Sequence, residues 1–328
     1  MVEYQYSPVT FQPRSRLWRL LRHAPTRLRS ERGWTSSAAF VISIFQERVT
    51  AFREANTEAQ QKHAAIAIAL SRLPPFHAAA LKLLNVSVES NTAIADFEAV
   101  FKSDPALAAD LLLVANSAEF GCPHRIDSIR HAIAFLGLER VRSLGCTIAF
   151  SYYVRNLPRN PYNRSVWAHG LATAVISDAL CRKGKAPTAY TAGLMHDLGR
   201  LALSASMGQD YMEQMSREFG DIAEANAWEK SQFGTTHCAA GVVIAKNWGF
   251  PEGLRKGMGN HHGPPRGRYD SPENLVRLSC RIAQALDFPE VPLSEAVTVS
   301  LPTELSHPEI DLERLREEVQ RQLQTLAL

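Results

Sequence analysis

The spacing of apolar side chains predicts helices throughout this chain. Apolar residues recur at intervals of three and four, and no stretch alternates apolar with polar positions for long. Residues 35–73 contain neither proline nor glycine, and Ile42, Phe45 and Val49 share one helical face there. Pro74 and the proline after it end this helix, because proline disfavours helical backbone in the residue before it.

The same spacing continues after the two prolines and predicts an all-α protein with two lobes. Asp104 and Pro105 are typical of a helix start, with Asp as the N-cap and Pro in the first position. Asp127 is expected to cap the next helix, and the pair Asn116–Ser117 to hydrogen-bond a turn within the first lobe. The stretch 156–161 is rich in Asn and Pro and separates the lobes. Beyond it, helices are expected near 164–183, 188–204, 208–219, 222–230, 235–247, 251–260, 273–287 and 309–326.

These breaks divide the chain into four predicted parts. They are a basic arm that we expect to be poorly ordered (1–35), an N-terminal helix (36–72), a two-lobed domain (73–290, with lobes 73–158 and 162–290), and a C-terminal extension with a helix (291–328).

The arm is the one strongly charged region. Residues 1–33 contain seven arginines and two acidic residues, a net charge of +5, whereas the whole chain carries +3. Leucines and a tryptophan interleave with the arginines near residues 16–22. Two interpretations stay open: an arm that contacts an anionic surface of lipid or nucleic acid, and an extension that is poorly ordered or packs on its own chain.

Composition narrows the class of protein. An apolar content of 45% is ample for one large domain or two medium ones, and the small net charge does not favour nucleic-acid binding by the whole molecule. No apolar run reaches the ~18–20 residues of a membrane helix, and the start lacks a signal sequence. The five cysteines are scattered without a CxxC motif, which indicates free thiols and a cytoplasmic protein.

Candidate chemistry is concentrated in the second half. Five histidines between residues 169 and 262, and the aspartate next to one of them, are of the types that ligate divalent metals. They are His169, His196, Asp197, His237, His261 and His262.

Several motifs around these residues resemble one known family. In order along the chain they are LPP (73–75), DPAL (104–107), VANSA (114–118), IDSI (126–129), AIAFLG (132–137), AGLMHDLGR (192–200), WGFP (248–251) and NHH (260–262). Together they resemble HDOD domains, the HD-related output domains of bacterial signalling, over about residues 70–290.

The resemblance implies an all-helical regulatory module and a site of known type. HDOD proteins act through protein contacts, whereas their HD relatives, including the HD-GYP phosphodiesterases, are metal-dependent phosphohydrolases. By resemblance, His169, His196 and Asp197 would hold a metal such as Fe, Mn, Zn or Mg. His237, together with His261 and His262, would supply the further ligands of two-metal relatives.

The sequence also departs from the hydrolases. Cys280 stands where they place a final aspartate. Its thiolate could ligate zinc or iron, and the alternative is a neutral buried thiol. The GYP signature is missing after His262. Arg200 replaces the lysine that often follows the HD-x-G turn, and Arg and Lys are not equivalent toward phosphate. Arg200 is a candidate anion-binding residue. Arg266 and Arg268, in the basic loop after His262, could also contact phosphate, or they could belong to a solvated surface loop.

The resulting prediction is a bacterial signal-transduction output or scaffold module without hydrolase activity. Its partners would be signalling or regulatory proteins. Two alternatives stay open: a metal-dependent phosphohydrolase that acts on a nucleotide or cyclic dinucleotide, and a sensor that binds a metal or nucleotide.

Overall fold

The computed structural model describes residues 29–30, 33–34, 70, 73, 76–157, 159–181, 188–265, 267–294, 297 and 311–326. Contacts divide the chain into two compact units, Met1–Gln60 and Gln61–Leu328. The described residues of the first unit form one antiparallel pair, β1 (Arg29–Ser30) with β2 (Gly33–Trp34). The rest of the predicted arm and almost all of the predicted helix at 36–72 lie outside the described residues. The domain limits drawn from the sequence stay predictions.

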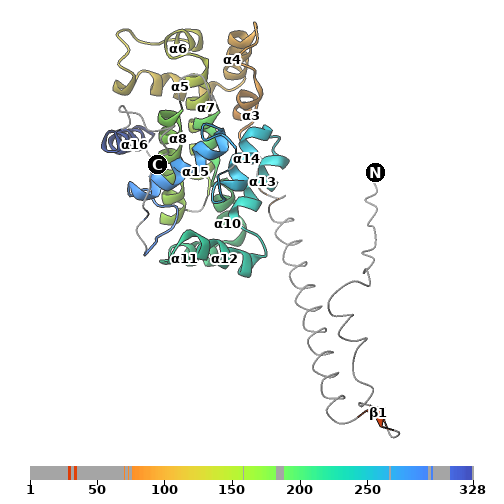
Figure 1. Cartoon of the computed structure of the whole chain (residues 1–328). Helices are drawn as coiled ribbons and strands as arrows, with labels where there is room; N and C mark the ends of the chain where they lie inside the picture. Colours follow the sequence, from red (N-terminus) through yellow and green to blue (C-terminus); the bar gives the residue numbers. More distant parts are fainter. Residues whose placement is uncertain are drawn as a thin grey trace, which may run out of the picture. The chain divides into compact units, whose positions relative to one another are not determined.

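The first lobe of the larger unit is built around one long helix. Its helices are α3 (Ala78–Asn85), α4 (Ala93–Lys102), α5 (Pro105–Ala115), α6 (Ile129–Leu136) and α7 (Leu138–Arg155). Helices α3, α5 and α6 all pack on α7 (Figure 1). Phe97, Phe101, Leu107 and Leu111 are fully buried, so the interior of this lobe is apolar.

Local sequence signals set the helix starts in this lobe. Asp104 accepts a hydrogen bond from the backbone N–H of Leu107 at 3.0 Å, with Pro105 in the first helical position, as predicted. The side-chain amide of Asn116 donates to the carbonyl of Ile126 and accepts from its backbone N–H, as predicted for the turn. The hydroxyl of Ser117 has no hydrogen-bond partner, so the prediction is right for Asn116 and wrong for Ser117. The prediction for Asp127 is wrong. Ser128 caps α6 instead, because it directly precedes the helix and its hydroxyl accepts from the third residue on.

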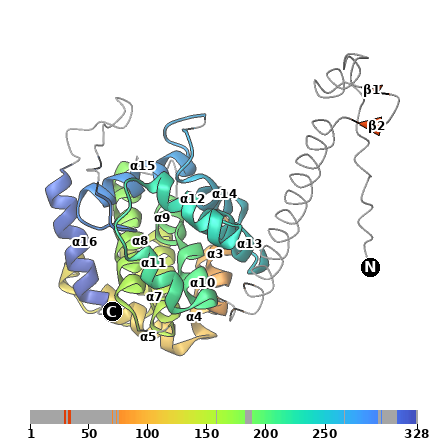
Figure 2. The same ribbon diagram turned by 90° about the horizontal axis from the view of Figure 1, so that it is seen from below.

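The second lobe is centred on α8. After a cap by Asn160 it contains α8 (Pro161–Leu180), α9 (Ala189–Met195), α10 (Leu198–Met207), α11 (Gln209–Met215), α12 (Ile222–Phe233), α13 (His237–Asn247), α14 (Glu252–Asn260) and α15 (Pro272–Ala285). Helix α8 packs against α9 and α15, and α16 (Leu312–Leu326) lies along its side (Figure 2).

One continuous apolar core joins the two lobes. Phe76 stacks on Trp248 with ring centroids 5.8 Å apart, and Phe150 meets Trp167 at 5.5 Å. Between residues 76 and 326, the described elements are helices apart from an isolated bridge between Phe219 and Leu293. The predicted all-α fold is therefore confirmed. Within the described residues, no helix is both long and apolar enough to span a membrane.

Candidate functional site

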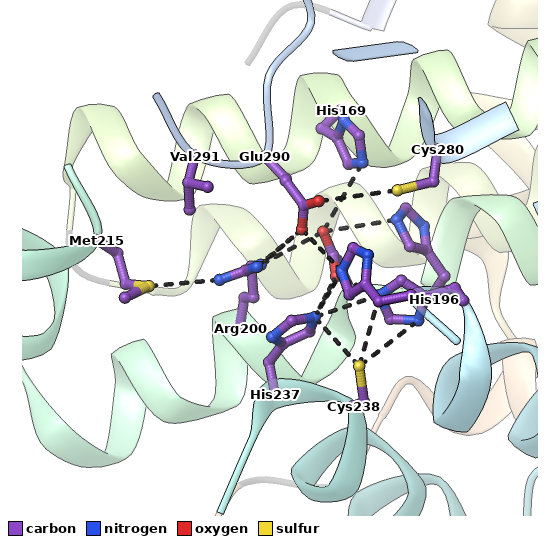
Figure 3. Close-up of polar contacts among 12 residues, drawn as sticks. His169, His196, Arg200, Met215, His237, Cys238, Cys280, Glu290 and Val291 are labelled. Atoms are coloured by element: carbon purple, nitrogen blue, oxygen red, sulfur yellow. Dashed lines mark hydrogen bonds and ion pairs between the residues drawn. The ribbon is translucent and has the colours of Figure 1, made fainter. Parts of the chain in front are cut away.

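The predicted ligands meet in the interior of the second lobe. His169 comes from α8, the His196–Asp197 pair from the junction of α9 and α10, and His237 from the first position of α13. His261 and His262 follow α14, and Cys280 comes from α15. Their ligand atoms form two separate groups, and within each group all atoms lie within 4.8 Å of one another. One group contains His169, His196 and Cys280, and the other contains Asp197, His237, His261 and His262 together with Glu290. Figure 3 shows the labelled members of both.

The break between α9 and α10 allows His196 and Asp197 to face the same point. Successive residues inside a helix point about 100° apart, so adjacent ligands need a helix end. Helix α9 ends at Met195 and α10 begins at Leu198, which leaves the pair at the junction. Gly199 then lets α10 approach α13, because a Cβ at this position would lie 1.9 Å from the carbonyl oxygen of His237. The glycine of the motif thus positions His237.

The carboxylate of Asp197 lies at the centre and divides the histidines into two groups. Its Oδ2 lies 3.5 Å from Nε2 of His196 and 3.9 Å from Nε2 of His169. Its Oδ1 lies 3.3 Å from Nε2 of His261 and 3.5 Å from Nε2 of His237. A carboxylate in this position can bridge two cations, one on each side.

Backbone carbonyls fix the tautomers of three of these histidines. Nδ1 of His169 lies 2.6 Å from the carbonyl of Phe288, and Nδ1 of His196 lies 2.6 Å from that of Gly193. Nδ1 of His261 is 2.8 Å from the carbonyl of Met258. A carbonyl only accepts, so Nδ1 carries the proton, and in a neutral ring Nε2 presents a lone pair toward Asp197. Metal-ligating histidines are oriented in this way.

The histidine nitrogens and carboxylate oxygens that face the centre of the cluster are better suited to bind a metal than to hydrogen-bond one another. Nε2 of His169, Nε2 of His196 and both carboxylate oxygens of Asp197 are buried without a hydrogen-bond partner. Such groups are costly to bury unpaired, and here all of them are acceptors. Burial lowers the pKa of His196 to about 3, so its ring is neutral, as a ligand must be. A divalent cation would satisfy the whole set.

A buried ion-pair network surrounds this cluster. The guanidinium of Arg200 is fully buried, 2.8 Å from Glu290 and 3.0 Å from Glu229, and it lies 3.7 Å from Asp197. Glu229 also accepts from Nδ1 and from the backbone N–H of His237, both at 2.8 Å. Burial lowers the pKa of Arg200, but Glu290 and Glu229 outweigh it, so the pKa lies well above its usual value.

Three members of the site were missed from the sequence. Glu290 lies 3.8 Å from Sγ of Cys280 and 3.3 Å from Nε2 of His262, and thus supplies a carboxylate beside the cysteine. Glu229 belongs to α12, and Cys238 follows His237 with its sulfur 3.4 Å away. Nothing in their local sequence marks them, because each contributes through contacts made only in the folded chain.

The three arginines proposed for anion binding differ in position. Arg200 belongs to the buried network, whereas Arg268 is exposed and paired with Asp270 at 2.6 Å. Arg266 lies outside the described residues. A cavity of about 480 Å³ lies beside the site and offers two other arginines. Its lining includes His261, His262, Cys280, Glu290, Arg277 and Arg281. Nε of Arg277 is buried there without a hydrogen-bond partner.

Comparison with known proteins identifies the family. The HDOD domain profile matches residues 73–264. An uncharacterized protein of Treponema pallidum is 25% identical over 243 residues, which cover 71% of this chain and 45% of that protein. The chain therefore spans less than half the length of this relative.

Solved structures share the fold. An HDOD domain protein of unknown function from Geobacter sulfurreducens aligns with a TM-score of 0.58 and 22% identity, over 81% of this chain and 94% of that one. A candidate phosphohydrolase from Shewanella amazonensis aligns with a TM-score of 0.53 and 22% identity, over 80% and 96%. A candidate signal transduction protein from Marinobacter aquaeolei aligns with 0.51 and 19%, over 82% and 64%. Because the profile covers more than half of the sequence, this chain belongs to the HDOD domain family.

Proposed function

We propose that this protein is a signalling output module that acts through protein contacts and holds a metal in its core without hydrolysing phosphoesters. The site residues serve to bind the metal and to join helices. His169, His196, Asp197 and Cys280 would hold it, and they come from α8, the α9–α10 junction and α15. In hydrolytic sites a metal with an open position activates water and neutralises phosphate charge.

The burial and pairing of Arg200 is the observation that carries this proposal. Arg200 stands where HD hydrolases often have a lysine. A positively charged side chain without an acidic partner at this position could bind a phosphate. Here the guanidinium is fully buried and held by Glu229 and Glu290. Its charge is therefore already compensated, and Glu290, the carboxylate beside Cys280, is one of the two groups that compensate it.

The first lobe offers surface for a protein partner. Ile94 on α4, Leu113 on α5 and Phe135 on α6 are 44%, 72% and 42% exposed. The three helices pack on one another. Exposed apolar side chains on neighbouring helices favour an interaction surface.

A panel of cyclic dinucleotides and mononucleotides with Mn²⁺, Fe²⁺ or Mg²⁺ tests the proposal. We expect the full chain to turn over none of them above the rate without protein. Metal-dependent turnover that is lost in Asp197→Ala and retained in the exposed-arginine control Arg268→Ala would overturn it.

A phosphohydrolase is the second candidate, and the cavity beside the site favours it. Arg277 and Arg281 are one helical turn apart on α15 and line this cavity with His262. A phosphate could enter there and meet positive charge. If the protein is a phosphohydrolase, at least one nucleotide of the same panel should be turned over. Arg277→Ala should then raise the KM for that nucleotide. The absence of turnover with every metal would exclude it.

A further inference from the structure

The turn that follows α15, residues 286–290, carries two of the groups that shape the metal cluster. The carbonyl of Phe288 lies 2.6 Å from Nδ1 of His169 and fixes the tautomer of that ring. Two residues further on, the carboxylate of Glu290 lies 2.8 Å from the guanidinium of Arg200 (Figure 3). A shift of this turn would release the ring of His169 and would leave Arg200 without one of its two close carboxylates.

Asp287, in the middle of the turn, has a backbone conformation that is unfavourable for most residues. Its φ is 65°, and among the described residues it is the only one other than glycine with a positive φ. The N–H of Phe288 donates to the carbonyl of Ala283 at 3.0 Å, which closes a type of helix ending that usually has glycine at the left-handed position. Aspartate adopts this region more readily than most residues, but such backbone persists only where surrounding contacts hold it.

Arg316 of α16 supplies such contacts on one side of the turn. Its Nε donates to the carbonyl of Leu286 at 3.3 Å, and its guanidinium is paired with the carboxylate of Asp287. On α8, the hydroxyl of Ser165 donates to the carbonyl of Pro289 at 2.9 Å. The turn is therefore held by two helices, α16 at its first two residues and α8 at its fourth.

Helix α16 connects this turn to the first lobe. It packs along α8 with Val319 fully buried (Figure 2). At its other end the guanidinium of Arg155, the last residue of α7, donates to the carbonyl of Leu326 at 2.9 Å. Both the turn and α16 lie beyond residues 73–264, so the matched family profile does not account for this connection.

We propose that Arg316 is a positioning residue for the metal cluster, which couples the docking of α16 to the placement of Phe288 and Glu290. With α16 docked, the left-handed turn is held, and His169 and Arg200 have their partners. When α16 detaches, the turn loses two contacts and relaxes. By linkage, a metal that binds the ordered cluster favours the docked helix to the same extent. The inference rests on the proposed function in taking His169 as a metal ligand.

Zinc affinity of the metal-free full chain, measured by calorimetry, tests this coupling. We expect Arg316→Ala to bind zinc about fivefold or more weakly than the wild type, the lower end of typical couplings between sites. Arg316→Lys keeps a cation near Asp287 and should restore most of the affinity. The matched control is Arg314→Ala, an exposed arginine of the same helix, which should bind zinc as the wild type does. Equal affinity in Arg316→Ala and the wild type would overturn the inference.

Thiol labelling in the presence of a chelator tests the turn without any metal. Cys280 is almost fully buried with Glu290 beside its sulfur, and Cys146 is fully buried in the first lobe. We expect alkylation of Cys280, mapped by mass spectrometry, to be at least about threefold faster in Arg316→Ala than in the wild type. Cys146 should label at an unchanged rate. An unchanged rate for Cys280, or an equal rise for both thiols that shows a global loss of stability, would contradict the positioning role.

The two measurements separate this inference from the proposed function. A wild type that binds no zinc would overturn the metal of the proposed function, and the labelling of Cys280 would still decide whether Arg316 holds the turn. Zinc binding by the wild type, with unchanged affinity and labelling in Arg316→Ala, would overturn the inference alone.

Discussion

The two lobes share one apolar core but differ in what they bury beyond it. The first lobe fills its interior with side chains such as Phe101 and Leu111. The second buries Arg200, Glu229 and the histidine cluster in its centre. Apolar burial is stabilising by itself, whereas buried charges are tolerated only when each has its partner. The second lobe should therefore depend on single polar residues and on a metal more strongly than the first, whose buried Arg142 donates to a backbone carbonyl, that of Val86.

The largest expected effect comes from removing the buried arginine. Arg200→Ala leaves Glu229 and Glu290 buried without their cation, which should lower the free energy of unfolding by about 3–5 kcal/mol. Arg268→Ala, an exposed arginine paired with Asp270, should cost less than about 1 kcal/mol. Denaturant unfolding measures both. Equal losses would show that the buried network contributes no more to stability than an exposed ion pair.

Alkaline pH should destabilise the first lobe through Tyr153. Burial raises the pKa of this phenol from 10.0 to about 12. Because the pKa of this phenol is higher in the folded protein, its neutral form stabilises the fold fully below pH 10. This stabilisation is lost as the pH rises toward 12. The shift corresponds to about 3 kcal/mol. Tyr153→Phe should remove this part of the pH dependence, whereas Tyr269→Phe, on the surface, should retain it. Thermal unfolding at several pH values provides the measurement, and identical profiles for all three proteins would refute the assignment.

Metal removal should lower the free energy of unfolding through the second lobe. The loss should equal or fall slightly below that expected from the ionisation of Tyr153. At a metal concentration 100 times its Kd, binding stabilises the folded protein by about 2.7 kcal/mol. A chelator should therefore lower the Tm of the wild type and leave that of Asp197→Ala unchanged. Phe101→Ala, in the first lobe, should show the wild-type response to the chelator. If the chelator shifted Asp197→Ala as much as the wild type, the metal would be bound elsewhere.

The smallest expected effect is a local one in the first lobe. Asp104→Ala removes the cap of α5 and should cost about 1 kcal/mol. Asp127→Ala should change stability by less than about 0.5 kcal/mol, because Ser128 is the cap of α6. Chemical denaturation of the two variants compares them directly, and a larger loss from Asp127→Ala would reverse the assignment of the cap.

The difference between the lobes also explains what the sequence could predict. Asp104 acts on a neighbour three residues away, so its role is visible in a short window. The cap of α6 was misassigned because Asp127 and Ser128 are adjacent and both suit the position. The predicted histidines and Cys280 do come together, since their motifs preserve order and spacing.

The rest of the site depends on contacts between distant residues. Glu290 meets Arg200 across 90 positions of sequence, and Glu229 reaches it across 29. No local pattern marks either carboxylate, because Glu229 on α12 and Glu290 after α15 meet Arg200 on α10 only in the folded chain. Cys238 was counted among scattered thiols, and only the folded arrangement shows its sulfur beside two histidines.

Zinc binding to the metal-free full chain, compared between wild type and Asp197→Ala by calorimetry and elemental analysis, tests the central claim most directly. Asp197 lies between both groups of histidines, so its loss should weaken binding on both sides. The account predicts at least one tightly bound zinc in the wild type and a loss of tenfold or more in affinity in the variant. A wild type that binds no metal, or a variant that binds it equally well, would contradict the account.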